Sequence, residues 1–183
     1  ANTTGTRNVA VGKNAMLSST TASDSVMLGT TAGDAITTGT SNTGVGADVM
    51  SSTTTGDFNV AMGNSALGAN TTADNNTAIG FFSMLLNTTG TGNAAVGRDS
   101  LRCNTTGNNN SALGKDALKL NTTASSNTAV GNSTLTTNTT GGSNTAGGAG
   151  AMFANTTGAN NTALGVDALA TNTTADENTA VGR

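Results

Sequence analysis

The residues of this chain that could carry chemistry are two acidic pairs, a single thiol and a series of Asn-Thr-Thr triplets. The pairs are Asp57 with Asp74 and Asp99 with Asp116, and the members of each pair have the same separation in the sequence. Carboxylate oxygens are ligands that Ca²⁺ prefers, so either pair would offer a cation site if folding brought its members together. A basic residue precedes each member of the second pair, however, and this favours a solvated turn. We therefore expect no metal site.

Catalytic groups are few. The chain contains no histidine and one cysteine, Cys103. Neither a histidine-based triad nor a zinc site of cysteine and histidine ligands can be built from these residues. We interpret Cys103 as a small apolar residue of the folded unit. The sequence thus indicates a protein that is not an enzyme and holds no cofactor.

The Asn-Thr-Thr triplets are formal acceptors for N-glycosylation. They would place a column of sugars on the molecule, or they are copied incidentally with a repeated unit, which is the simpler interpretation. The candidate acceptors are Asn70, Asn87, Asn104, Asn121, Asn138, Asn155 and Asn172.

The elements that position all these residues are copies of one short unit, in which every seventeenth position is a glycine. This spacing is kept along the whole chain, with no insertion or deletion. The anchor glycines are Gly12, Gly29, Gly46, Gly63, Gly80, Gly97, Gly114, Gly131, Gly148, Gly165 and Gly182. With the glycine as position 1, the unit reads G-x-x-A-L-x-x-N-T-T-G/A-x-x-N-T-A-V. Such a strict period predicts a single repeat array over residues 1–183.

The composition of the unit favours an all-β fold. Asparagine, threonine and glycine are poor helix formers, and the unit is too short to hold a pair of helices. We predict a parallel β-solenoid, or β-roll, of about eleven coils, with strands at N-T-A-V-G and around N-T-T. Asparagines at positions 8 and 14 should form hydrogen-bonded ladders along the stack. Charged residues fall at positions 2, 3, 6, 12 and 13, which marks these positions as exposed corners.

The N-T-A-V segment predicts how the coils associate. Neighbouring side chains of a strand point to opposite faces, yet positions 16 and 17 are both apolar. We expect the alanines of position 16 inside a thin coil and position 17 outside, where it forms an apolar stripe that packs against other copies of the chain. The alternative is a wider monomeric coil with position 17 inside. The stripe consists of Val11, Leu28, Val45, Met62, Ile79, Val96, Leu113, Val130, Leu164 and Val181.

The segment NTTGNNNSALGKDALKLNTTASSNTAVG, from Asn104 to Gly131, resembles repeats of bacteriophage tail fibres and related virion fibres. Its NTAVG and NTALG cores are also similar to the head repeats of trimeric autotransporter adhesins. The resemblance covers nearly the whole chain. It implies a homotrimeric β-roll whose aliphatic residues pack at a three-fold axis.

These observations predict a structural or adhesive fibre on a virion or cell surface, outside the cell. The expected partners are further copies of the chain, in a homotrimer and end to end in a filament, together with an unidentified surface receptor or glycan. Both ends fall inside a repeat, so we expect a window of a longer fibre. A net charge of −3 and 2% aromatic residues argue against nucleic acid, and no apolar run suits membrane insertion. The alternatives are an ice-binding solenoid, suggested by threonine at positions 9 and 10, and a polysaccharide-binding phage fibre.

Overall fold

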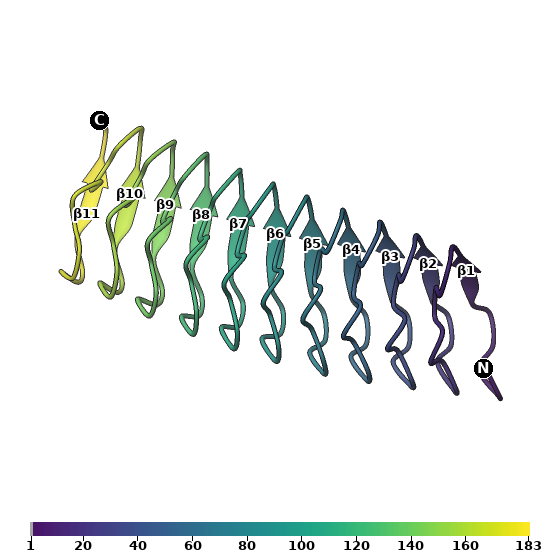
Figure 1. The fold of residues 1–183 in the computed structure, drawn as a ribbon. Helices are drawn as coiled ribbons and strands as arrows, with labels where there is room; N and C mark the ends of the chain where they lie inside the picture. Colours follow the sequence, from purple (N-terminus) through teal and green to yellow (C-terminus); the bar gives the residue numbers. More distant parts are fainter. Residues whose placement is uncertain (1) are drawn as a thin grey trace.

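The repeated unit folds into one coil of a parallel β-solenoid of about ten coils. The computed structural model describes residues 2–183 (Figure 1). Each unit contributes one short strand, which ends directly before the anchor glycine. The strands are β1 (Val9–Val11), β2 (Val26–Leu28), β3 (Thr43–Val45), β4 (Val60–Met62), β5 (Thr77–Ile79), β6 (Ala94–Val96), β7 (Ser111–Leu113), β8 (Thr128–Val130), β9 (Thr145–Gly147), β10 (Thr162–Leu164) and β11 (Thr179–Val181).

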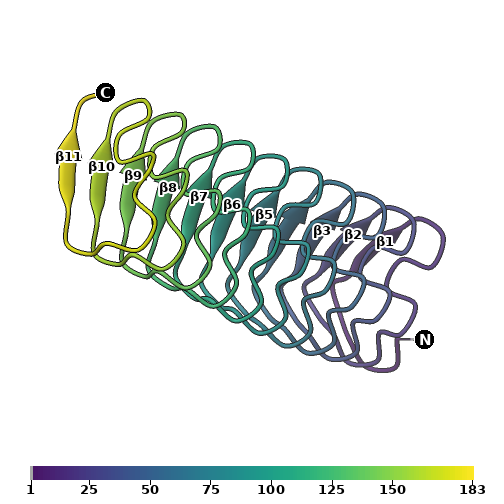
Figure 2. The same ribbon diagram turned by 60° about the vertical axis from the view of Figure 1, so that its left-hand side comes forward.

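The strands form one parallel sheet in sequence order, from β1 to β11. The register advances by one whole unit from strand to strand, so that Ala95 pairs with Ala112 and Val96 with Leu113. Successive coils therefore follow one another along a single axis, with the two chain ends at opposite ends of the rod (Figure 2). The predicted solenoid and its spacing are confirmed.

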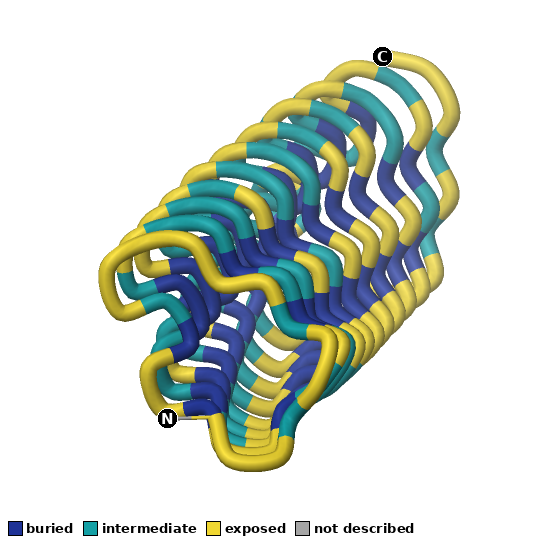
Figure 3. Tube along the Cα trace, turned by 90° about the vertical axis from the view of Figure 1, so that its right-hand side faces the viewer, coloured by how far each residue is buried: buried dark blue, intermediate teal, exposed yellow. Residues whose placement is uncertain are grey.

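Each strand from β2 to β10 buries its central residue and turns the other two outward, whereas the central residue is exposed in the terminal β1 and half-buried in β11. From β4 to β10 the alanines of position 16 are at most 2% exposed; they are Ala61, Ala78, Ala95, Ala112, Ala129, Ala146 and Ala163. The buried stretches recur at the same places in successive coils (Figure 3). Alanine thus faces the interior and position 17 faces outward, as expected, and the alternative of a wider coil with position 17 inside is wrong.

The second predicted strand, around N-T-T, does not form. Between Asn104 and Asn110 the buried residues recur at every third position, whereas a strand alternates at every second. The cause is a convergence of hydrogen bonds on one carbonyl. The oxygen of Thr105 accepts from the backbone N–H groups of Thr88, Thr89 and Gly90 at 3.0, 3.1 and 3.3 Å and from the Thr88 hydroxyl at 3.0 Å. This arrangement bends the chain at each Thr-Thr pair.

The bulky core residue of each coil lies at position 5, in an unusual backbone conformation. Leu101, for example, is fully buried and has a φ of 48°. The left-handed region costs an L-residue about 1–2 kcal/mol, and burial of a leucine side chain contributes about 1.5–3 kcal/mol. Burial therefore offsets the strain. The buried residues of this kind are Met16, Met50, Leu67, Met84, Leu101, Leu118, Leu135 and Met152.

The anchor glycine is required by the next coil as well as by its own backbone. Gly97 has a φ of 135°, and a Cβ atom there would lie 2.5 Å from the carbonyl oxygen of Gly114. Gly114 meets Gly131 in the same way, at 2.3 Å. The coils can approach to hydrogen-bonding distance only because this corner carries no side chain.

Two asparagine ladders run through the interior and confirm the predicted arrangement. In the position-8 ladder, Asn104 Nδ2 donates to Asn87 Oδ1 at 2.8 Å and to the carbonyl of Gly107 at 2.9 Å. In the position-14 ladder, Asn93 Oδ1 accepts from the backbone N–H of Asn110 at 2.9 Å, and Asn93 Nδ2 also donates to Gly107 at 2.9 Å. These bonds satisfy polar groups that would otherwise be buried without partners.

One coil departs from the consensus and compensates within its own interior. Position 5 is Gly33, and position 8 is Ile36 in place of the usual asparagine. A Cβ atom at Gly33 would lie 2.7 Å from Ile36 Cδ1 and 3.0 Å from Met27 Sδ. Met27 also covers Gly44, whose Cβ atom would lie 2.6 Å from its sulfur. Larger side chains from two other walls thus fill the volume that a leucine occupies elsewhere.

Candidate functional site

An apolar stripe at position 17 extends along the length of the rod. Six of its members are exposed, for example Val11 at 59%, Leu113 at 52% and Val130 at 44%. The other four, Leu28, Val45, Ile79 and Val96, are half-buried. Gly147 interrupts the stripe because it has no side chain. The Leu164 side chain of the next coil lies beside it, since a Cβ atom at Gly147 would lie 3.1 Å from Leu164 Cδ2.

The residues of position 15 share the outer face of the sheet with the apolar stripe. They are apolar near the N-terminus, at Val9, Val26 and Val60, and mostly threonine towards the C-terminus. An uncovered sheet face normally carries polar side chains, and an apolar surface of this extent is typical of an interaction site. The strands place equivalent residues of this face next to one another, because each strand pairs in register with the next.

The candidate glycan acceptors lie inside the rod. Asn70, Asn87, Asn104, Asn121, Asn138 and Asn155 are fully buried, and Asn172 in the last full coil is half-buried. Their amide nitrogens donate to the position-8 ladder and to backbone carbonyls, as Asn121 Nδ2 does to Asn104 Oδ1 at 2.8 Å and to Ala124 O at 3.0 Å. The folded coil therefore encloses the nitrogen that a glycosyltransferase would modify.

The two threonines that follow each asparagine have different environments. The hydroxyl of position 9 donates to the next coil, as from Thr105 to the Thr122 carbonyl at 3.1 Å. Position 10 is exposed in every coil, and its hydroxyls form no side-chain hydrogen bond within residues 2–183. We call this set the threonine column; it comprises Thr4, Thr21, Thr38, Thr55, Thr72, Thr89, Thr106, Thr123, Thr140, Thr157 and Thr174.

The threonine column is uniform although the other exposed columns vary. Position 2, for instance, holds Lys13, Thr30, Ala47 and Phe81 in different coils. The Asn-Thr-Thr glycosylation motif does not explain why position 10 is always threonine. Thr38 is present in a coil where position 8 is isoleucine, so no such motif exists there. The column is therefore a second candidate surface, and it is one of the two threonine positions that suggested an ice-binding solenoid.

The acidic pairs are used within the protein. Asp57 Oδ1 accepts from the Thr40 backbone N–H at 2.6 Å, and Asp74 Oδ1 accepts from the Asp57 backbone N–H at 2.7 Å. Asp99 and Asp116 form ion pairs with basic side chains of their own coils. Within residues 2–183, no group of three or more cysteine or acidic residues is placed to hold a metal ion.

The ion pairs lower the pKa of two carboxyl groups, those of Asp116 and Asp24. Burial raises the pKa of Asp116, but hydrogen bonds from Lys119 and Lys115, together with their charges, outweigh burial and lower the pKa below its usual value. The hydrogen bond from Arg7 likewise lowers the pKa of the exposed Asp24. Both carboxylates serve as acceptors in ion pairs, which gives them a structural role.

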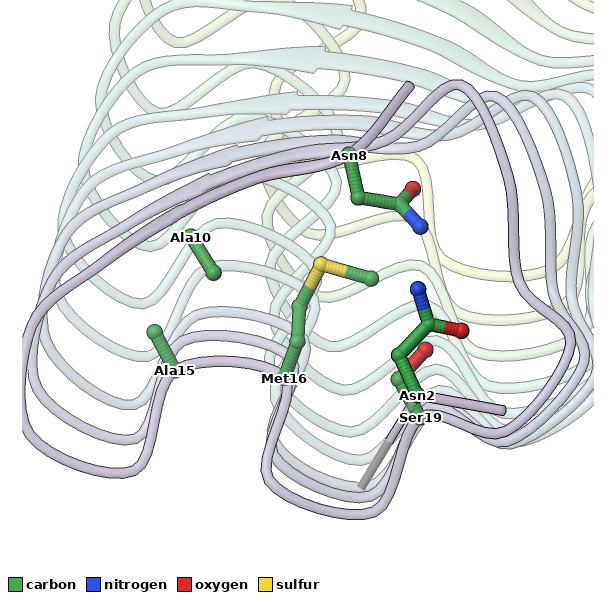
Figure 4. A pocket seen from close by; sticks show the side chains of 6 residues that line it. All are labelled: Asn2, Asn8, Ala10, Ala15, Met16 and Ser19. Atoms are coloured by element: carbon green, nitrogen blue, oxygen red, sulfur yellow. The ribbon is translucent and has the colours of Figure 1, made fainter. Parts of the chain in front are cut away.

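A cavity of about 200 Å³ lies at the N-terminal end of the rod (Figure 4). Asn2, Asn8, Ala10, Ala15, Met16 and Ser19 line it. These residues belong to columns that are buried in the interior coils, so the cavity is the open end of the same interior and adds no chemistry. Cys103 is half-buried and free, at a position where other coils carry leucine, alanine, serine or threonine.

Comparison with protein-family models, with curated proteins and with solved structures gave no significant match to this chain. No helix among residues 2–183 is long and apolar enough to cross a membrane.

Proposed function

We propose that this chain is a segment of a structural, adhesive fibre on the outside of a virion or cell. Three parallel copies pack their apolar stripes around a common axis, and the resulting rod holds an attachment surface away from its base. The observation that carries this proposal is the exposed apolar stripe, which runs from Val11 to Val181 along one face of the sheet. The number of chains follows the resemblance to trimeric fibres.

The chemistry of the stripe supports lateral association. Burial of apolar area contributes about 25 cal/mol per Å², and the contribution accumulates because nearly every coil adds one aliphatic side chain to the same line. Neighbouring rods meet with equal spacing, since all units have the same length. The short, in-register strands also keep the stripe straight enough for a second copy to follow it.

Light scattering of the purified chain tests the proposal, and the expected mass is that of three chains. The double variant Leu113→Asp with Val130→Asp should be monomeric at micromolar concentration while keeping its β-rich circular dichroism. The matched control places aspartates in the same two coils at Thr106 and Thr123, and it should remain trimeric. A monomeric wild-type chain, or the same mass for both variants, would contradict the proposal.

The threonine column favours a second candidate function, which is ice binding. Threonine presents a methyl group and a hydroxyl together, and the stack repeats this pair at the strand spacing of about 4.8 Å. Its hydroxyls form no side-chain hydrogen bond within residues 2–183. Thermal hysteresis that is abolished by Thr106→Lys with Thr123→Lys, but kept by the Leu113 and Val130 variant, would support this function. The absence of hysteresis in the wild-type chain would exclude it.

A further inference from the structure

One part of the surface differs from the rest of the rod because basic and aromatic residues gather there. We call it the basic-aromatic patch; it comprises Phe81, Phe82, Arg98, Asp99, Arg102, Lys115, Asp116 and Lys119. Its four basic and two acidic residues give it a formal charge of +2. The other three basic and eight acidic residues give the remainder of the chain a charge of −5. The patch is therefore a positive area on an acidic rod.

Within the patch, each carboxylate is shared by two cations. Asp99 lies 3.0 Å from Arg98 Nε and 3.7 Å from Arg102 Nε. In the next coil, the carboxylate oxygens of Asp116 lie 3.0 Å from Lys115 Nζ and 2.9 Å from Lys119 Nζ. One negative charge thus faces two positive charges in each coil, which leaves one positive charge per coil without a counterion in the chain.

The stacking of the coils places these surplus charges side by side. The backbone N–H of Asp116 donates to the carbonyl of Arg98 at 3.0 Å, so Arg98 and Lys115 are neighbours in one column. Their side chains are 62% and 52% exposed. Like charges side by side in neighbouring coils repel each other. An anionic group that bridges the two coils would relieve this repulsion.

Two aromatic side chains of the preceding coil, Phe81 and Phe82, lie next to the cations. The backbone N–H of Asp99 donates to the carbonyl of Phe81 at 3.0 Å, which makes the patch continuous across three coils. Phe81 is 46% exposed, and its ring centre lies 3.8 Å from that of Phe82. Arg102 lies over the Phe82 ring, 5.6 Å from its centre. The ligand that fits this surface has an apolar face next to its negative charges.

We propose that the basic-aromatic patch binds an acidic polysaccharide. A chain of uronic acid units carries one carboxylate per sugar for the two cationic coils, and the apolar face of a sugar ring can stack on Phe81. The patch is open, and an extended polymer can cross several coils of it. This inference rests on the proposed attachment role and names the ligand class for it.

Binding of the full chain to polygalacturonate, measured by biolayer interferometry at low salt, tests the proposal. We expect binding that weakens as salt is added, because salt screens exposed charges within about 10 Å. Arg98→Gln with Lys115→Gln should weaken it about five- to tenfold, and Phe81→Ser should weaken it several-fold. The matched controls are Lys13→Gln at the same coil position and Phe58→Ser at another exposed phenylalanine, and both should bind like the wild-type chain.

Three outcomes would overturn the proposal. They are no binding of polygalacturonate by the wild-type chain, equal binding of its fully methyl-esterified form, and unchanged binding by the Arg98 and Lys115 variant. Equal affinity for single-stranded DNA would indicate general attraction to polyanions and would also overturn it. The mass of each variant is measured in parallel, so that failure of the trimer and failure of the patch are seen separately.

Discussion

The anchor glycine shows how a single residue is fixed by a neighbouring coil. Gly97 needs its φ of 135° for the corner after the strand, and Gly114 leaves no space for a Cβ atom. Replacement by alanine would strain the backbone and push two coils apart at once. The column remains glycine throughout because each member excludes a side chain from the one before it.

We predict that Gly97→Ala destabilises the chain by more than about 2 kcal/mol, measured by urea unfolding. Gly92→Asn is the matched control, since asparagine already occupies the same left-handed position at Asn75 and Asn109. A Cβ atom at Gly92 would lie 2.6 Å from Asn109 Oδ1, which is the end of an exposed side chain and can rotate away. The variant should therefore change stability by less than about 1 kcal/mol. Similar losses of stability in both variants would disprove this explanation of the glycine column.

The ion pairs predict how stability depends on pH. The pKa of Asp116 is lower in the folded chain than in the unfolded chain, where it is about 3.9. The carboxylate therefore stabilises the fold above that value, and the contribution is lost as pH falls through the folded pKa. The same direction holds for Asp24 beside Arg7.

We expect the melting temperature to fall between pH 6 and pH 2, and Asp116→Asn should reduce this fall. Circular dichroism melts across this range provide the measurement. If the variant and the wild-type chain lose the same amount on acidification, the ion pairs of Asp116 do not contribute.

At the scale of the element, the coil was predictable where burial follows a simple alternation. In N-T-A-V, the alanine column and the outward position 17 followed from the two-fold period of a strand. The N-T-T segment was wrongly predicted as a strand because its geometry depends on hydrogen bonds between coils. The hydroxyl of Thr88 and three N–H groups donate to the Thr105 carbonyl, and no residue pattern within one unit records this.

Of the candidate surfaces, those confined to one column of the aligned units were predictable from the sequence, and the one that crosses columns was not. The apolar stripe is one column, and a column is visible when the units are aligned. The basic-aromatic patch crosses columns and occupies only three coils, from Phe81 to Lys119. Its signal in the sequence was the succession of R-D-x-x-R and K-D-x-x-K at equal positions of neighbouring units.

At the scale of the whole molecule, the rod is a sum of coils that contact only their neighbours. Its stability should therefore depend on the register of the stack more than on the number of coils. The asparagine ladders reinforce this dependence, because each amide finds its partners at fixed separations along the chain, as Asn144 does with Gly158 and Asn161.

Deletion of residues 131–147, one complete unit, should preserve the β-rich spectrum and cooperative unfolding. Deletion of residues 131–138 should abolish both, because every column after the cut would meet the wrong partner. Circular dichroism and thermal unfolding distinguish the two. A chain that tolerates both deletions equally would show that the stack does not depend on register.

The coil that contains Gly33 has a wider consequence for how such a chain can change. Met27 and Ile36 show that the side-chain volume in the interior of one coil can come from different positions of the unit, provided that the interior stays filled. Buried residues can therefore be replaced only in compensating sets. Gly33→Leu alone would overfill the interior unless smaller residues replaced Met27 and Ile36. Compensated substitutions of buried residues leave the diameter of the coil unchanged. The outer surface that contacts neighbouring molecules therefore also keeps its shape.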